Sequence, residues 1–306
     1  MAKKPFTLYW SSLDTYEHCP QRFLWSRGWG AIDLGNGPGK RKPKPIKRSA
    51  HHAFMGTVIQ AVIEWMYNSE IWRDPQKMKA RMLEQLDKTF RIEQGNFFLD
   101  SRMGMPHAEM YEVCQNGIVG FVKTMKANRL LGPYAKSEID LVGYANKWTP
   151  IGGRADIIIR REDTGVSIFD GKNSQTKGKY TDPDQLRWYA LCFYLAYGKM
   201  PERLGFIYFR YPYGTPIEGS DEVESGIDWI PYAKTDIQGL AQRAIDARKA
   251  MHKEKFDPNP SPPYCKWCDW ETVCEERQAQ RKKRARKPKE IDDTLDGADG
   301  FVDITF

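Results

Sequence analysis

Four of the six cysteines form a pattern that joins two distant parts of the chain. Cys265, Cys268 and Cys274 follow C-x2-C-x5-C spacing within PPYCKWCDWETVC, and Cys19 lies in SSLDTYEHCPQRFLW. Thiolates two residues apart converge on one metal, because a tight turn points both sulfurs the same way. The fourth ligand must come from elsewhere, and Cys19 is the best-placed candidate. We therefore expect one metal site that ties the two flanks of the fold together around a central region.

Composition is typical of a soluble globular protein with reduced cysteines. Of 306 residues, 41% are hydrophobic and 28% are charged, and no apolar run approaches the roughly 20 residues that span a membrane. The N-terminus has lysines but lacks the apolar segment of a secretory signal. Six cysteines in such a chain indicate a reducing, cytoplasmic compartment and metal binding. Cys114 and Cys192 stand apart and are expected to be buried core thiols.

The net charge of +7 is unevenly spread. Lysine and arginine gather in GKRKPKPIKR (39–48) and in RKKRARKPK (281–289). Both clusters contain proline and lack apolar periodicity, so they are predicted to be mobile arms and not helices. They are either solvated segments or contacts to nucleic-acid phosphates, where each cation would release counterions on binding.

Apolar periodicity and capping residues predict several helices. Ser11 or Ser12 is expected to cap a first helix, and Asp182, Pro183 and Gly198 bound a strong later one. Spacings of three, four and seven residues between apolar positions predict further amphipathic helices over 53–67, 75–95, 107–129 and 234–255.

Between these helices the chain is rich in β-branched residues bounded by Gly, Pro and Asp. This pattern predicts strands in SEIDLVGYA, PIGGRADIIIRR, GVSIFDGKNS and RLGFIYFRYP. The order of elements predicts an α/β core with the cysteine segments on either side of it. We divide the chain into an N-terminal segment with a basic linker (1–48), a core (49–233), a helix with the cysteine cluster (234–280) and a basic then acidic tail (281–306).

Two neighbouring strands each carry one acid. GGRADIII places Asp156 inside a hydrophobic strand, and Asp170 in SIFDGKNS lies where a strand ends, with Lys172 two residues on. Side chains repeat with a period of two along a strand, so Asp170 and Lys172 project to the same side. Two carboxylates suit Mg2+ or Mn2+, and an ammonium beside them can position a water and offset phosphate charge. The set therefore predicts hydrolysis at phosphorus.

Two predicted helices add polar groups at four-residue spacing. Gln185 and Tyr189 share one face, and Gln60 and Glu64 share another with Gly56, whose missing side chain would allow a close approach. Each pair alone is weak, because helix faces carry such pairs by chance.

Taken together, these segments resemble the RecB-like branch of the PD-(D/E)XK nuclease superfamily. The resemblance is to its iron–sulfur members, the CRISPR-associated RecB-like exonucleases and the nuclease domains of AddB-type helicase–nucleases. It implies a central mixed sheet flanked by helices, with an iron–sulfur subdomain formed by both chain ends. The matching segments, in the family's order from Tyr9 to Cys274, are SSLDTYEHCPQRF, GTVIQAVIE, GGRAD, FDGK, QLRWY and CKWCDWETVC.

The resemblance implies a role for each motif residue. Asp156, Asp170 and the Gly171 carbonyl would hold Mg2+ or Mn2+, with Gln60 and Glu64 on the nearby helix. Lys172 would be the catalytic lysine, and Gln185 and Tyr189 would orient it and contact DNA. The iron–sulfur ligands of a 4Fe-4S cluster would be Cys19, Cys265, Cys268 and Cys274. Zinc remains the alternative metal, because spacing alone cannot separate two four-thiolate sites.

One position departs from the family. Many relatives have a histidine where this chain has Gln60, and His51 and His52 are poor substitutes, since eight helical residues span about 12 Å. A mostly oxygen site suits Mg2+ at least as well as Mn2+ and should bind either more weakly.

These features predict a metal-dependent DNA exonuclease that acts on single-stranded or frayed DNA in recombination, repair or replication. The alternatives are a non-catalytic DNA-binding adaptor and a CRISPR spacer-processing factor. The residues expected to contact DNA are Lys40, Arg41, Lys42, Arg154 and Arg187.

The last residues suggest a protein partner. DGADGFVDITF is acidic, ends at Phe306 and loosely resembles the Asp-Ile-Pro-Phe tails with which bacterial single-strand-binding proteins recruit partners. Phe306 would enter an apolar pocket, and Asp303 would meet basic residues. The alternatives are a fold-back onto the protein's own DNA path and a solubilising tail.

Overall fold

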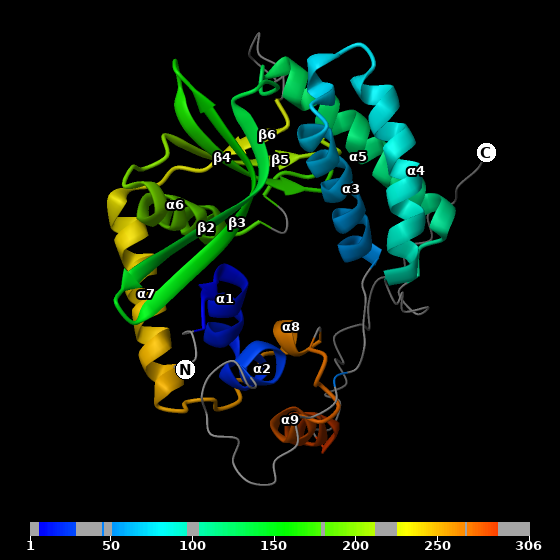
Figure 1. Cartoon of the computed structure of the whole chain (residues 1–306). Helices are drawn as coiled ribbons and strands as arrows, with labels where there is room; N and C mark the ends of the chain where they lie inside the picture. Colours follow the sequence, from blue (N-terminus) through cyan, green and yellow to red (C-terminus); the bar gives the residue numbers. More distant parts are fainter. Residues whose placement is uncertain are drawn as a thin grey trace, which may run out of the picture.

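The structure is a computed structural model that describes residues 6–28, 45, 51–96, 104–178, 181–211, 225–266 and 268–286. In these residues one mixed six-stranded sheet lies between helices (Figure 1). The α/β core expected from the sequence is therefore confirmed. The strands are β1 (Leu8–Tyr9), β2 (Ala135–Asn146), β3 (Thr149–Arg161), β4 (Gly165–Lys172), β5 (Arg203–Tyr208) and β6 (Ile227–Trp229).

Strand β3 organises the sheet, because three strands pair with it. β2 runs antiparallel to β3 along almost its whole length. On the other side, β1 pairs in parallel near the start of β3, and β4 pairs antiparallel with its last five residues. β5 then joins β4 in parallel, and β6 pairs antiparallel with β5. Between β1 and β4, the middle of β3 is left open to other contacts.

Two helical layers bury the two faces of the sheet. Helices α3 (His51–Asn68), α4 (Met78–Asn96) and α5 (His107–Ala127) form one hydrophobic core with Ile157, Ile159 and Phe169. Helices α6 (Pro183–Tyr197) and α7 (Lys234–His252) form the other core with Ile151, Ile158 and Ile168. The remaining helical segments are α1 (Trp10–His18), α2 (Pro20–Phe23), a π turn (Leu24–Gly28), a 3-10 turn (Ile71–Arg73), α8 (Pro262–Cys265) and α9 (Glu275–Arg286).

Helix α6 has the ends that its sequence predicts. The Asp182 side chain accepts a hydrogen bond from the Asp184 amide, and Pro183 occupies the first helical position. Gly198 ends the helix with a φ of 70°, a left-handed conformation that glycine adopts without steric cost. The helices expected over 53–67, 75–95, 107–129 and 234–255 are confirmed as α3, α4, α5 and α7.

Two local predictions were wrong. Helix α1 starts at Trp10 after an extended Tyr9, and neither Ser11 nor Ser12 caps it, because the preceding residues pair with β3 as strand β1. The basic cluster at 281–289 is helical up to Arg286. Two glutamates in the first turn of α9 interact favourably with the positive end of the helix dipole. Arg281 of the same helix forms an ion pair with Glu271 at 2.6 Å. The rest of that cluster, most of the 39–48 cluster and the acidic tail lie outside the described residues.

No helix in the described ranges is long and apolar enough to cross a membrane. Cys114 and Cys192 are fully buried, as expected for core thiols.

Candidate active site and cysteine pocket

The two acids predicted to be neighbours lie side by side in the sheet. The register pairs Ile157 with Phe169, and one more residue along both antiparallel strands sets Asp156 opposite Asp170. The Gly171 amide donates a hydrogen bond to Asp156 Oδ2 at 2.8 Å. Asp170 is buried, whereas Asp156 is partly exposed. The pair is therefore accessible from the Asp156 side.

Lysine and glutamine complete a closed network around Asp170. Lys172 Nζ lies 2.5 Å from Asp170 Oδ1 and donates to Gln185 Oε1 at 3.1 Å. Gln185 Nε2 in turn donates to Asp170 Oδ2 at 2.8 Å and to the Tyr189 hydroxyl at 3.1 Å. One amide on α6 thus fixes the carboxylate and the ammonium relative to each other. The predicted shared faces of Asp170 with Lys172 and of Gln185 with Tyr189 are confirmed.

The electrostatics of the two acids favour a bound cation. Burial raises the pKa of Asp156 well above its ordinary value, and the neighbouring Asp170 raises it further. Burial also raises the pKa of Asp170, which Lys172 opposes. Asp170 Oδ1 faces the Lys172 ammonium at 2.5 Å, which is the only cation beside the two acids among the described residues. A divalent cation at this point would relieve the repulsion between Asp156 and Asp170.

The polar face of α3 contacts the site through Glu138 of β2. Gln60 Nε2 donates to Glu138 Oε1 at 2.6 Å, and Glu64 is close enough to raise the pKa of Glu138. A side chain added at Gly56 would meet nothing within 4 Å. The close approach expected at Gly56 was therefore wrong, although Gln60 and Glu64 do share a face.

Sequence reasoning missed Glu138, the third acid of the site. Its φ is 52°, a left-handed conformation that few non-glycine residues adopt and that often marks a functional position. Its carboxylate forms an ion pair with Arg154 at 2.8 Å, and its charge raises the pKa of Asp156. Burial is the main cause of its own raised pKa. The only sequence signal is an acid within the strand that precedes GGRAD.

No three His, Cys, Asp or Glu side chains of the described residues are placed to hold a single metal ion together. A cation at Asp156 and Asp170 would therefore have two carboxylate ligands and fill its other positions with carbonyl oxygens or water, as Mg2+ often does. Glu138 then acts beside this site through charge and through its hold on Gln60 and Arg154.

The residues expected to contact DNA have different positions. Arg154 is exposed on β3 beside the site, where it also lies 3.7 Å from Asp140. Arg187 is held at the start of α6 by Asp184 and by the Pro231 carbonyl. Lys40, Arg41 and Lys42 lie outside the described residues.

An arginine of α7 links the first helix to the catalytic helix. Arg243 pairs with Glu17 of α1 and with Asp184 of α6, each at 2.6 Å. Glu17 is two residues from Cys19, and Asp184 is next to Gln185. Arg243 thereby connects the segment with the first cysteine of the cluster to the segment with the glutamine of the site.

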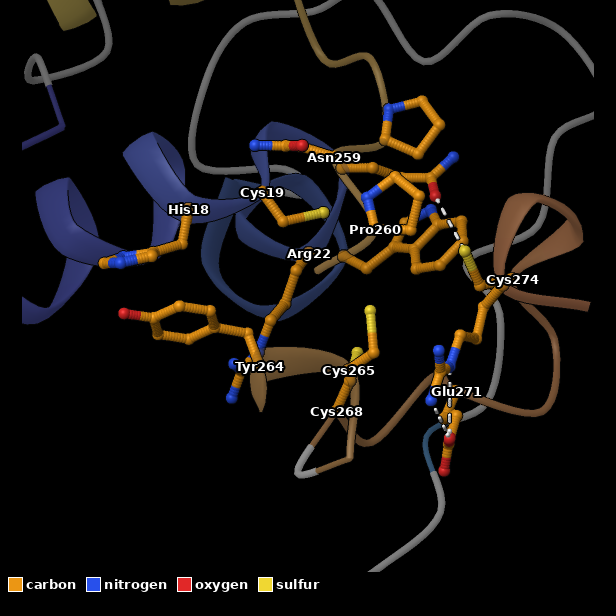
Figure 2. A pocket seen from close by; sticks show the side chains of 14 residues that line it. His18, Cys19, Arg22, Asn259, Pro260, Tyr264, Cys265, Cys268, Glu271 and Cys274 are labelled. Carbon is orange, nitrogen blue, oxygen red and sulfur yellow. Dashed lines mark hydrogen bonds and ion pairs between the residues drawn. The ribbon is translucent and has the colours of Figure 1, made fainter. Parts of the chain in front are cut away.

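The four cysteines of the motif line one hollow formed by α1, α2 and the segment after α7. Figure 2 shows Cys19, Cys265, Cys268 and Cys274 around this space, with the Cys274 thiol hydrogen-bonded to Gln21 Oε1 at 3.7 Å. Burial is the main cause of the raised pKa of Cys265 and of Cys268, and nearby thiols, Cys19 among them, contribute to both. The predicted convergence of distant cysteines is thus present in the fold.

The comparisons with known proteins agree with this geometry. The profile of the PD-(D/E)XK nuclease superfamily matches residues 9–275. The chain belongs to the PD-(D/E)XK nuclease superfamily. Asp170, Gly171 and Lys172 fit the (D/E)-X-K element that the name of the superfamily describes. Membership indicates a metal-dependent nuclease, generally a phosphodiester hydrolase.

Other comparisons add less about this PD-(D/E)XK protein. A solved structure titled "Crystal structure of SSO0001" is 18% identical, with 77% of this chain and 89% of that chain covered and a TM-score of 0.32. No curated relative is found.

Proposed function

We propose that the protein is a metal-dependent DNA exonuclease of the RecB-like iron–sulfur branch, acting on single-stranded or frayed DNA in the cytoplasm. The observation that carries the proposal is the network of Asp170, Lys172 and Gln185 beside Asp156. Lysine and glutamine each hold one oxygen of the buried Asp170 carboxylate, and a second acid lies directly opposite it on the next strand.

Each residue has a role in phosphodiester hydrolysis. Asp156, Asp170 and the Gly171 carbonyl would hold Mg2+ or Mn2+, which supplies charge stabilisation and a more acidic bound water. Lys172 would place its ammonium next to the scissile phosphate and offset the charge that develops there. Gln185 would orient the lysine beside Asp170, because its own carbonyl oxygen accepts a hydrogen bond from Nζ.

A digestion of end-labelled DNA tests the proposal. Single-stranded and duplex oligonucleotides, each labelled at one end, are incubated with Mg2+ or with EDTA. We expect stepwise loss of the single strand with Mg2+ and none with EDTA. Internal cuts in a circular single strand would contradict the exonuclease assignment, and no cleavage with either Mg2+ or Mn2+ would contradict the nuclease itself.

One observation favours the rival, a non-catalytic DNA-binding protein. Gln60 stands where relatives resembling this chain have a histidine, and its amide is engaged by Glu138. DNA binding in EDTA without cleavage in either metal is the result expected for that rival.

The raised pKa values of Asp156 and Asp170 predict a pH dependence. An acid whose pKa is higher in the folded chain stabilises the fold below its unfolded pKa of about 4, and this contribution is lost as pH rises through the folded pKa. Mg2+ binds ionised carboxylates and so competes with protons at low pH. We expect Mg2+ to raise the melting temperature more at about pH 8 than at about pH 5.5. Thermal denaturation with and without Mg2+ measures this.

A variant in which Asp156 and Asp170 are both replaced by Asn is the control, because it should show little stabilisation by Mg2+ at either pH. Equal stabilisation of the unaltered protein at both pH values would mean that these acids do not titrate in metal binding.

Glu138→Gln should weaken Mg2+ binding about tenfold, the scale on which groups next to metal ligands act. It removes a charge beside Asp156 and loosens Gln60 and Arg154. The Mg2+ dependence of the cleavage rate and of thermal stability measures the change. Asp140→Asn is the matched control, since Asp140 also lies near Arg154 but its side chain is 73% exposed. An equal effect of both substitutions would assign the loss to Arg154 and not to Glu138.

The cysteine hollow supports the iron–sulfur part of the proposal. A 4Fe-4S cluster binds each thiolate to a different iron, so its four sulfurs stand farther apart than those around one zinc at about 2.3 Å. The four thiols line one space, as either four-thiolate site would require, and metal analysis separates a cluster from zinc.

A further inference from the structure

The outer half of the β2–β3 hairpin exposes aromatic rings. Tyr144 on β2 is 57% exposed, Trp148 in the turn is 68% exposed, and Val142 between Tyr144 and the site is 51% exposed. Tyr9 of β1, 41% exposed, is in register with Gly152 of β3, which is also the partner of Val142. Residues in register across a sheet present their side chains on the same face. We call Tyr9, Val142, Tyr144 and Trp148 the aromatic platform.

The platform is part of a well-packed sheet. On the opposite face of the same strands, Leu141 and Ile151 are buried in the core that α6 and α7 form. A Cβ atom added at Gly152 would meet Tyr9 Cε1 at 3.1 Å and Cζ at 3.2 Å. Because glycine has no side chain, the Tyr9 ring can lie close against β3. The rings are thus presented by a rigid scaffold, and a cluster of exposed apolar side chains of this kind marks a binding surface.

Cations stand at both ends of the platform. Lys147 Nζ lies 5.0 Å from the centre of the Trp148 ring and has no acidic partner in the part of the chain that the structure describes. At the other end Arg154, two residues beyond Gly152, pairs with Glu138 at 2.8 Å. The exposed Asp140 also lies on this side, and Arg154 compensates its charge at 3.7 Å.

The platform leads to the candidate active site. Gly152 and Asp156 are four residues apart on β3, which is about 13 Å along a strand. Roughly four stacked nucleotides cover that distance, since each rises 3.4 Å. In Figure 1 the hairpin formed by β2 and β3 extends away from α3.

We propose that the aromatic platform binds single-stranded DNA by base stacking and delivers the strand to Asp156 and Asp170. The proposal rests on the nuclease function proposed above and adds where the uncleaved strand lies. Aromatic rings stack on any base and neighbouring cations follow the backbone, whereas a duplex hides the faces of its bases. The rings, Lys147 beside Trp148 and the place of the platform on the strand that carries Asp156 favour a nucleic-acid strand over a protein partner.

Binding in EDTA tests the platform without cleavage. Fluorescence anisotropy is measured with a labelled oligo-dT and with a blunt duplex. Tyr144→Leu keeps an apolar side chain but removes the ring, and we expect it to weaken oligo-dT binding about tenfold. Trp148→Leu should act similarly, Tyr144→Phe should bind like the unaltered protein, and duplex affinity should not change. Trp229→Leu is the matched control, because Trp229 is 42% exposed on β6 at the other side of the sheet.

The outcomes separate this inference from the nuclease proposal. Weaker oligo-dT binding by Tyr144→Leu in a protein that never cleaves DNA would support the platform and contradict the nuclease. Active protein with unchanged binding in Tyr144→Leu and Trp148→Leu would overturn the platform alone. If Tyr144→Leu weakens the binding of oligo-dT and of duplex equally, the platform contacts phosphates and does not stack on bases. If the unaltered protein does not bind oligo-dT at all, the face is left to a protein partner. Each of these two results would overturn the proposal.

Discussion

Replacing Asp170 by Asn is expected to lower metal-dependent DNA cleavage on the order of 10³-fold or more, the scale of losing a central catalytic group. Asn has nearly the same shape and keeps an acceptor for Gln185, but it removes the charge that faces Lys172 and a cation. Burial disfavours the ionised form of Asp170, which offsets part of the loss of its ion pair with Lys172, so the variant should remain folded. Cleavage of labelled DNA and thermal denaturation, measured on the same preparation, separate the two effects.

Asp163→Asn is the matched control for this experiment. Asp163 follows β3 on the surface and pairs with Arg161 at 2.6 Å, so its loss should leave the cleavage rate unchanged. Full activity in Asp170→Asn would show that Asp170 is not part of the active site. A marked decrease in the melting temperature of this variant would assign Asp170 a structural role instead.

With the proposed 4Fe-4S cluster in place, Cys19→Ser and Cys268→Ser should each lose the iron, although 249 positions separate the two cysteines in the sequence. Both thiols face the same hollow, and a cubane cluster that loses one of four thiolate ligands becomes labile. We expect about four irons per chain in anaerobically purified protein and close to none in either variant. Iron and acid-labile sulfide analysis, together with the brown colour, provides the measurement.

Cys192→Ala gives the comparison, because Cys192 belongs to α6, is fully buried and does not line the hollow. It should keep its iron even if its stability falls. Colourless unaltered protein with one zinc per chain would refute the cluster, and iron retained by Cys19→Ser would show that a different residue supplies the fourth ligand.

Short-range sequence patterns were enough to predict part of this structure. Asp182, Pro183 and Gly198 act on the backbone next to them, so they determine both ends of α6 almost independently of the rest of the fold. Asp170 and Lys172 are two residues apart on a strand, and the period of the strand alone puts them on one side. The fold class and the centre of the site rest on such short-range rules.

Other features depend on contacts that no local pattern encodes. Glu138 belongs to the site because its backbone takes a left-handed conformation and because Gln60, from a helix 78 positions earlier, donates to it. β1 has two residues and exists only through its pairing with β3. The sequence of α9 has no apolar periodicity and therefore predicts a mobile charged arm. In the structure it is a helix, and ion pairs such as that of Arg281 with Glu271 hold it to its neighbours. Each of these needed the assembled fold.

The position of β1 has a consequence for how the chain folds. Tyr9 pairs with Gly152, and Cys19 shares its hollow with Cys274, so residues 8–19 must wait for partners that leave the ribosome much later. Pairings this distant in sequence are slow to form, because a large loop must close first. We expect the β2–β3 hairpin and the helices α3 to α5 to assemble early, while residues 8–19 join late. Refolding should therefore show a final slow phase that reports on Trp10 and its surroundings.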